Sequence, residues 1–229
     1  MTMSRRIHPA EATQVAPGRV TAITGSPRAA GRFDVEIDGR PTLRLSIDGI
    51  ERLKIRVGTS VDELLAAKLG READVMRAYD RAMAMLAVRG RAAGELRRLL
   101  IQKGEPSDLV SESITRLVAA GFLDDAAFAR QFARSRAASG WSRRRIDREL
   151  GRRGVDRGTT SEAIAEVFAE EGIDDRDTIL REAQKKLRML GRVDEVTRRR
   201  RLYGYLARRG YEADAIGEVL RSLTTDETN

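Results

Sequence analysis

Apolar and polar residues alternate near the start of the chain, in the segments 33–37 and 43–47, and the segment 20–23 before them is also strand-like. Strict alternation buries one face of a strand and leaves the other in water. Asp38-Gly39 separates the second and third segments and is typical of a hairpin turn. The pattern therefore predicts a small antiparallel sheet, followed by a further turn at Asp48-Gly49.

The spacing of Ser60-Val61-Asp62-Glu63 matches a capping box, which predicts the start of a helix that runs through Leu69. A break is expected at Gly70. From Arg71 almost to the end, apolar residues recur every three or four positions, which is the spacing of buried helical faces. The chain is therefore expected to be helical after the sheet.

The helical part repeats itself. Two apolar residues four positions apart, with a glycine four positions later, occur three times in steps of 50 and 56 residues. The three sets are Leu96-Leu100-Gly104, Ile146-Leu150-Gly154 and Leu202-Leu206-Gly210. Apolar residues also lie ten and thirteen positions beyond each glycine. This joint coincidence predicts tandem repeats of three helices each.

We therefore expect a mainly α protein, with tandem three-helix repeats in an elongated curved array and a small N-terminal antiparallel β module before them. The expected parts are a flexible arm (1–17), a β-rich module with a helix (18–70), three repeats (71–121, 122–172 and 173–224) and a tail (225–229). Because the outer faces of such an array are polar, it needs no partner to fold, and a monomer is expected.

The segment 121–154 contains two apolar pairs at helical spacing, Phe128 with Phe132 and Ile146 with Leu150. Each pair should lie on one face of a helix. A break is expected near Gly140, and Ser142 is placed to cap the helix that follows. The prediction is a helical hairpin with a thin apolar seam and an arginine-rich outer surface.

Composition limits the class of protein. Of the 229 residues, 41% are apolar, 4% aromatic and 34% charged, and none is cysteine. The lack of cysteine excludes disulfides and thiolate chemistry. No apolar run is long enough for a membrane helix or resembles a signal peptide. A soluble, cytoplasmic protein is expected, with no membrane association.

The net charge of +8 is concentrated in blocks. Residues 130–153 carry nine arginines against two acidic residues, and residues 181–201 carry nine basic residues against three acidic ones. Residues 162–177 reverse the sign, with seven acidic residues and one arginine. Such blocks indicate a polyanionic or acidic partner, although a solvated face is the better explanation for any single arginine. No helix carries a set of side chains typical of major-groove reading.

Candidate catalytic groups each have a simpler structural explanation. The glycines of the segment 25–31 only approximate a phosphate-binding loop and better fit a hairpin. Asp124-Asp125 and Asp174-Asp175 could hold a metal ion, but each pair stands where a helix begins, where acidic residues complement the helix dipole. His8, the only histidine, has no partner in sequence. No enzyme activity, cofactor or metal is expected.

Three tyrosines lie in or just after the last basic block: Tyr203, Tyr205 and Tyr211. Tyrosines there could stack on nucleic-acid bases. Packing in the core or seam of the third repeat is the favoured interpretation.

Two motifs carry a resemblance to a known family. The first is Gly121-Phe-Leu-Asp-Asp-Ala-Ala-Phe-Ala129, followed by Gly140-Trp141 and by Arg145-Ile146-x3-Leu150-x3-Gly154. The second is Ala82-x3-Leu86, Arg89-Gly-Arg91 and Glu95-Leu96-x3-Leu100-x2-Lys103-Gly104. Together they resemble the signature of RecX, the regulator of RecA recombinase, and the likeness extends from about residue 19 to 223.

The resemblance implies a regulator without catalysis, acting in DNA repair, homologous recombination and the SOS response. Such a protein binds RecA and its filament on single-stranded DNA, and DNA itself is a further candidate partner. It lowers recombinase, ATPase and coprotease activity by blocking filament extension or promoting disassembly. The alternative is a free-standing helical DNA-binding protein, a transcription or nucleoid factor, that acts without RecA.

Charge and position, not the family motif, suggest the partner-binding residues. They are the basic side chains of the second and third repeats: Arg143, Arg144, Arg145, Arg148, Arg152, Lys185, Lys186, Arg198, Arg199, Arg200 and Arg201.

Overall fold

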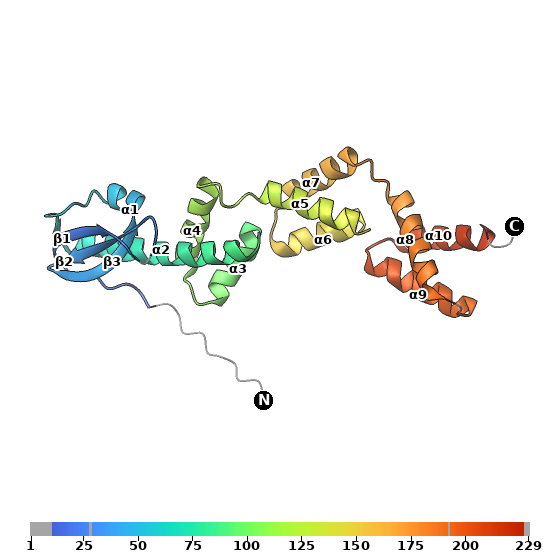
Figure 1. Ribbon diagram of the computed structural model, residues 1–229, viewed down its shortest axis with the longest axis horizontal. Coiled ribbons are helices and arrows are strands. Elements are labelled where there is room, and N and C mark those ends of the chain that lie inside the picture. Colours follow the sequence, from blue (N-terminus) through green and yellow to red (C-terminus); the bar gives the residue numbers. More distant parts are fainter. Residues whose placement is uncertain (1–10, 28, 192, 227–229) are drawn as a thin grey trace, which may run out of the picture. The chain divides into compact units, whose positions relative to one another are not determined.

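The computed structural model describes residues 11–27, 29–191 and 193–226, with side chains in the last helix described through residue 223. These residues form two compact units (Figure 1). The first unit runs to Arg91 and includes Leu96–Leu123, and the second comprises Ala92–Glu95 and the chain from Asp124 onward. Predicted features within residues 1–10, His8 among them, lie outside the described residues.

The first unit opens with the predicted antiparallel sheet. Its strands are β1 (Gly18–Gly25), β2 (Arg32–Ile37), β3 (Arg40–Ser46) and β4 (Ser60–Val61), in the order β3-β2-β1-β4. As the alternating pattern predicts, apolar residues of the strands are buried: Val35 and Leu45 are both fully covered. Gly25 ends β1 and Arg32 begins β2, and these two strands pair with each other, so a hairpin is found here as expected.

Two local predictions in this unit are wrong, and a third is right about where a helix starts, at Glu63, but wrong about its cap. Asp48-Gly49 is not a turn, because helix α1 (Ile47–Arg52) passes through it with Ser46 as its N-cap. The capping box does not form, because Ser60 pairs with β1. Instead, the side chain of Asp62 caps the next helix by accepting from the Leu65 amide at 2.7 Å.

The predicted break at Gly70 is also absent, because helix α2 runs without interruption from Glu63 to Val88. A side chain at Gly70 would lie 2.4 Å from the carbonyl oxygen of Thr13. Thr13 in turn donates through its hydroxyl to Asp74 of α2 at 2.6 Å. Glycine at position 70 therefore marks a close approach of the chain to the helix, and not a helix end.

The rest of the described chain is helical. The helices after α2 are α3 (Ala93–Gln102), α4 (Ser107–Ala119), α5 (Asp125–Ala138), α6 (Arg143–Arg153), α7 (Arg157–Glu170), α8 (Asp175–Leu190), α9 (Glu195–Arg208) and α10 (Ala213–Asp226). The mainly α fold with tandem three-helix domains and an N-terminal antiparallel sheet is thus confirmed.

The three sets of residues that predicted the repeats have the same burial and the same backbone turn in the structure. The two apolar residues of each set are at most 2% exposed in α3, α6 and α9. The glycine that follows is left-handed each time, with φ of 89° at Gly104, 85° at Gly154 and 88° at Gly210. A left-handed residue after a helix favours glycine because it has no Cβ to clash. The same turn therefore recurs three times.

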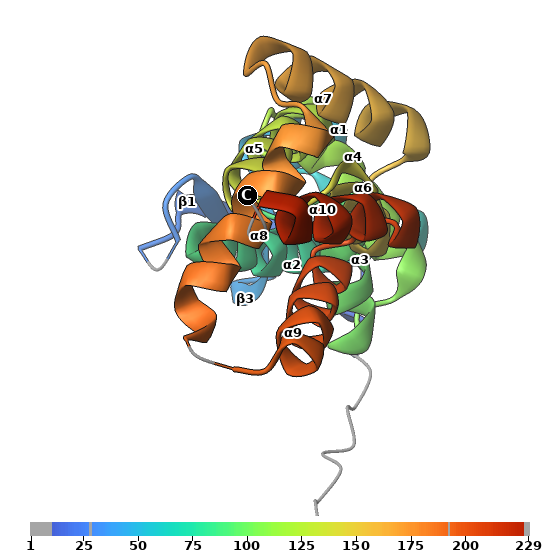
Figure 2. The ribbon, with the colours of Figure 1, turned by 90° about the vertical axis from the view of Figure 1, so that its right-hand side faces the viewer.

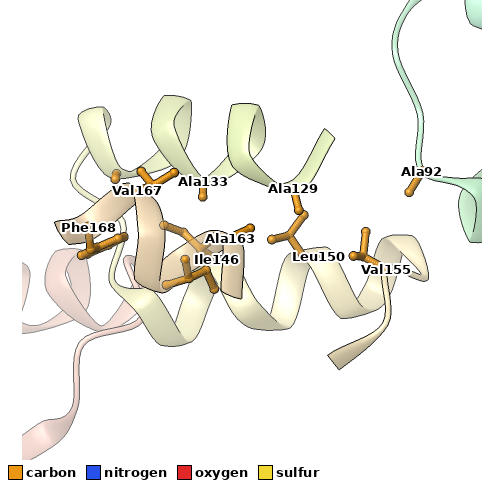
Figure 3. Packing of buried hydrophobic residues seen from close by; sticks show 11 residues of the cluster. Ala92, Ala129, Ala133, Ile146, Leu150, Val155, Ala163, Val167 and Phe168 are labelled. Atoms are coloured by element: carbon orange, nitrogen blue, oxygen red, sulfur yellow. The ribbon is translucent and has the colours of Figure 1, made fainter. Parts of the chain in front are cut away.

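The core of the second repeat lies between α5, α6 and α7 (Figure 3). Ile146 and Leu150 are fully buried, as predicted. On α5, however, the buried stripe is alanine, with Ala129 and Ala133 fully covered, while Phe128 and Phe132 are only partly buried at its edge. The predicted seam is therefore shifted by one residue, and small side chains let the helices approach closely.

Polar residues cap these helices. Asp124 accepts from the Ala127 amide at 2.9 Å, and Asp174 accepts from the Arg176 amide at 2.6 Å. Ser142 caps α6 as predicted, by accepting from the Arg145 amide at 3.3 Å. The interpretation of both aspartate pairs as helix starts is confirmed.

In the third repeat, α8, α9 and α10 pack around a separate core (Figure 2). Ile179, Leu202, Leu206 and Ile216 are each at most 2% exposed. No helix of the second repeat contributes to this core, although Tyr211, one of its members, donates a hydrogen bond to the carbonyl of Gly140.

Glycine also permits a close approach within the second unit. A Cβ at Gly94, in the first turn of α3, would lie 2.7 Å from the Cα and the carbonyl oxygen of Gly154. Both atoms are backbone, so neither can move aside cheaply. Beside this contact, Arg153 pairs with Glu95 at 2.9 Å.

We predict that Gly94→Ala lowers the free energy of unfolding by about 2 kcal/mol, because the added methyl group overpacks the backbone contact with Gly154. Urea denaturation followed by circular dichroism measures the change. Gly151→Ala is the matched control: this helical glycine has no neighbour within 4 Å, so alanine should stabilise the protein by up to about 1 kcal/mol. Equal effects of the two substitutions would contradict the close approach.

Candidate partner-binding surface

Helix α6 presents a stripe of arginines because its apolar residues define the opposite face. Ile146 and Leu150 point into the core, and at 100° per residue the positions 144, 148 and 152 lie on the far side. Arg144, Arg148 and Arg152 are all exposed, as the sequence predicts.

Arg143 and Arg145 flank this stripe and lie on aromatic rings. The guanidinium of Arg143 is 4.2 Å from the ring centre of Phe168, and its Nε is 3.3 Å from the carboxylate of Asp175. The guanidinium of Arg145 is 3.7 Å from the ring centre of Trp141. Cation–π contacts of this kind hold both side chains against the protein.

Arg145 also joins the second repeat to the third. Its guanidinium donates to the backbone carbonyl of Arg208, at the C-terminal end of α9. A cation there complements the helix dipole. Burial lowers the pKa of Arg145, but a guanidinium remains charged at neutral pH.

Within the stripe, two arginines are paired and one is open. Arg144 forms an ion pair with Glu212, beside the start of α10, and Arg152 pairs with Glu149 at 2.9 Å. Arg148 has no ion pair or hydrogen bond among the described residues. Arg148 is therefore the arginine of α6 that is most available to a partner.

Some basic residues of the third repeat also have a partner within the protein, and others are exposed. Arg198 pairs with Glu195, and the ammonium of Lys186 lies 5.5 Å from the ring centre of Tyr205. Lys185 and Arg199 are exposed. Arg200 and Arg201 are also exposed, and they line a hollow of about 410 Å³ between α8 and α9. The complete lining is Lys186, Leu190, Arg200, Arg201, Gly204 and Arg208.

Arg208 is a further candidate, which lies outside the basic blocks of the sequence. The repeat itself contained the signal, because Arg208 stands 56 residues after Arg152 and at the same distance from the terminal glycine. Projecting the α6 stripe onto α9 would have found it.

A buried ion pair stabilises the junction of the second and third repeats. Glu182 of α8 is 7% exposed in its side chain and pairs with Arg209 at 3.0 Å. It also accepts from the hydroxyl of Tyr205 at 2.7 Å, and burial raises the pKa of that hydroxyl, which keeps it a donor. Arg209 in turn donates to the carbonyl of Ser139. Sequence gave no hint of this pair, because a single glutamate in a helix resembles any surface residue.

The three tyrosines near the last basic block differ in their contacts and exposure. Tyr205 belongs to this buried pair, and Tyr211 is 8% exposed and donates to the carbonyl of Gly140 at 3.3 Å. Both are packing residues. Tyr203 is 43% exposed and remains a candidate for stacking.

The described residues contain no group of three or more histidine, cysteine or carboxylate side chains placed to hold a metal ion. In the same part of the chain, no helix has both the length and the apolar character that a membrane crossing requires.

We predict that Glu182→Ala destabilises the protein by about 3 kcal/mol, because it leaves Arg209 partly buried without its counter-ion. The free energy of unfolding in urea measures this. Glu170→Ala is the control, since Glu170 pairs with Arg134 at 2.9 Å with both side chains 52% exposed. Removing that surface pair should cost no more than about 1 kcal/mol. A loss at Glu182 as small as at Glu170 would show that the buried pair does not hold the junction.

Comparison with known families accounts for all three repeats. Residues 78–117 match the family described as "RecX, first three-helix domain", residues 124–164 the second three-helix domain and residues 174–220 the third. The matches fall in the order and spacing of the observed repeats.

Individual proteins agree. A protein named "Regulatory protein RecX" from Amycolatopsis mediterranei is 38% identical over 168 residues, which cover 71% of this chain and 94% of that protein. Its namesake from Ectopseudomonas mendocina is 36% identical over 61% of this chain and 90% of its own length. A crystal structure of regulatory protein RecX superposes with a TM-score of 0.70 at 18% identity and covers 89% of this chain and 98% of that one. RecX from Lactobacillus salivarius gives a TM-score of 0.52 at 18% identity, over 66% of this chain and 97% of that one. The two solved structures support the fold.

Proposed function

We propose a function for this protein from its family, because the chain belongs to the RecX family. Its relatives are named regulatory proteins, which suggests that it too acts on another protein. We infer that this partner is RecA, alone and in its filament on single-stranded DNA. Binding would block filament extension or promote disassembly, and recombinase, ATPase and coprotease activities would fall as a result. The protein would act in the cytoplasm, as a monomer, without cofactor or catalysis.

The observation that best supports this proposal is the cationic surface of the second and third repeats. Arg148 and Arg152 on α6, together with Lys185, Arg199, Arg200 and Arg201, present exposed positive charge on helices of one compact unit. A filament of protein on DNA offers acidic side chains and phosphates, both of which attract such a surface.

The other predicted residues act on this surface indirectly. Arg143, Arg144 and Arg145 contact the third repeat or the residues that lead to it: Asp175, Glu212 and the carbonyl of Arg208. We propose that they fix the position of the third repeat against the second and so arrange the residues that touch the partner.

The second candidate is a DNA-binding protein that acts without RecA. The hollow lined by Lys186, Arg200, Arg201 and Arg208 favours it, because this hollow contains no acidic residue. The two functions differ in stoichiometry. A protein that caps a filament acts at few sites, whereas a competitor for DNA must cover the lattice.

We predict that the protein inhibits the single-strand-dependent ATPase of RecA at ratios far below one molecule per RecA protomer. One bound molecule at a growing end stops addition of many protomers, which explains the expected excess of effect over stoichiometry. ATP hydrolysis measured over a titration of the protein, with DNA in excess, gives the result. Inhibition that begins only when the DNA is saturated would favour the DNA-binding alternative.

We predict that reversing Arg144 and Arg148 to glutamate abolishes this inhibition while the protein remains folded. Arg148→Glu alone is the sharper change, because Arg144 also pairs with Glu212. At the low end of the range for a contact residue, it should weaken inhibition about tenfold, equivalent to about 1.4 kcal/mol. Arg157→Glu, at the exposed start of α7, makes the same charge change elsewhere in the unit. Unchanged inhibition by Arg148→Glu at low salt would remove α6 from the contact surface.

A further inference from the structure

The hollow between α8 and α9 gathers positive charge that the described protein does not neutralise. Neither Arg200 nor Arg201 has an ion pair or a side-chain hydrogen bond to any described residue. The neighbouring Arg208 and Lys186 also lack a carboxylate partner there. Like charges held close together raise one another's energy, and a bound anion relieves this repulsion.

In the second repeat, the arginines at the positions equivalent to Arg200 and Arg201 have partners within the protein. Arg144 and Arg145 stand 56 residues before Arg200 and Arg201. In the second repeat they contact Glu212 and the carbonyl of Arg208, which belong to the turn between α9 and α10. These helix positions therefore bind negative charge and carbonyl oxygen.

The first turn of α3 also contacts the turn of the following repeat, although it carries an acidic residue and no arginine. Gly94 and Glu95 stand 106 residues before Arg200 and Arg201. They contact Gly154 and Arg153, in the turn that separates α6 from α7. Twice, then, the start of the second helix in a repeat binds the turn of the repeat that follows. No described segment binds Arg200 or Arg201 in this way.

The hollow exists because Gly204 replaces a large side chain. Gly204 stands where α6 has Arg148, and the guanidinium of Arg208 folds over it, 3.4 Å from where a Cβ would be. Lys186 closes the opposite side from α8. Three arginines and a lysine thus line an open space of about 410 Å³, which is large enough for a phosphate group. Guanidinium groups match phosphate oxygens in pairs.

The helix that lines one side of the hollow also carries an exposed aromatic ring. Tyr203 is 43% exposed and lies three positions after Arg200, so the two side chains are neighbours on the helix surface. A cationic groove next to an accessible ring is typical of proteins that bind single strands, because unpaired bases stack on the ring while the groove follows the phosphates. A duplex keeps its bases stacked inside and could not use Tyr203.

We propose that this hollow binds the phosphate backbone of single-stranded nucleic acid directly, with Lys186, Arg200, Arg201 and Arg208 on the phosphates and Tyr203 beneath a base. The proposal deepens the function proposed above, since it names the ligand of part of that surface. It is tested without RecA, so its failure is distinct from failure of RecA inhibition.

The experiment measures binding of the full-length protein to a fluorescent oligothymidylate by anisotropy, over a series of salt concentrations. The variant Arg200→Gln/Arg201→Gln removes two phosphate contacts. Each contact contributes about 0.7 to the slope of log K against log salt for single strands, so the slope should fall by about 1.4. At 0.1 M salt this corresponds to roughly 25-fold weaker binding. The matched control is Arg188→Gln, an exposed arginine two residues beyond Lys186 and therefore on another face of α8.

Two further variants separate charge from stacking. Gly204→Glu puts a carboxylate into the hollow while keeping every arginine, and should weaken binding at least as much. Tyr203→Leu should weaken binding severalfold with an unchanged salt slope, since stacking releases no counterions. Circular dichroism checks that each variant is folded.

Equal binding and equal slope for wild type, Arg200→Gln/Arg201→Gln and Gly204→Glu would overturn the proposal. Variants that keep DNA binding but lose RecA inhibition would assign the hollow to an acidic protein surface instead. Tighter binding of a duplex of equal length, with no effect of Tyr203→Leu, would exclude the single strand as its ligand.

Discussion

The second unit depends on one contact, in which the start of one helix meets a glycine turn. At Gly210 a Cβ would lie 2.5 Å from the Cβ of Arg145 and 2.7 Å from the hydroxyl of Ser142. The Ser142 amide there donates to the carbonyl of Arg209 at 3.0 Å. Gly154 meets Gly94 in the same way. Because only glycine allows both the left-handed turn and this approach, Gly154 and Gly210 determine how closely the starts of α3 and α6 approach the following repeat. The orientation of the arginines that follow is a consequence of that contact.

Arginine therefore has two roles in this protein. Some arginines cover the aromatic rings that the small alanine core leaves at its edge: Arg136 lies over both Phe132 and Trp141, and Arg153 lies 4.9 Å from the ring centre of Phe132. Their long side chains contribute apolar contact as well as charge. Such arginines cover the aromatic rings as core residues would in a protein richer in aromatic side chains. Few of the residues here are aromatic, at 4%, and arginines provide this cover instead.

Sequence predicted what depends on spacing and missed what depends on tertiary contacts. The 50- and 56-residue steps identified the buried leucines and isoleucines and the left-handed glycines, because both follow from local geometry. The shift from Phe128 and Phe132 to alanine on α5 was not visible, since both stripes have helical spacing and only the distance between helices decides which one is buried. Gly70 was misread because glycine serves a close contact as readily as a helix end. Glu182 was missed because its partner Arg209 lies 27 residues away.

Contacts within the protein reduce the positive charge that its arginines offer to a partner. Of the nine arginines between residues 130 and 153, Arg148 is the one for which the described structure provides no ring, carboxylate or carbonyl partner. A partner therefore meets far less charge on the second repeat than the sequence suggests. The third repeat carries the same arginine positions with fewer internal contacts, so positive charge is more available there. Exposed pairs such as Arg144 with Glu212 are worth at most about 1 kcal/mol, so an approaching phosphate or carboxylate could exchange with them at small cost. For an anionic partner, the third repeat therefore offers more unpaired positive charge than α6 does.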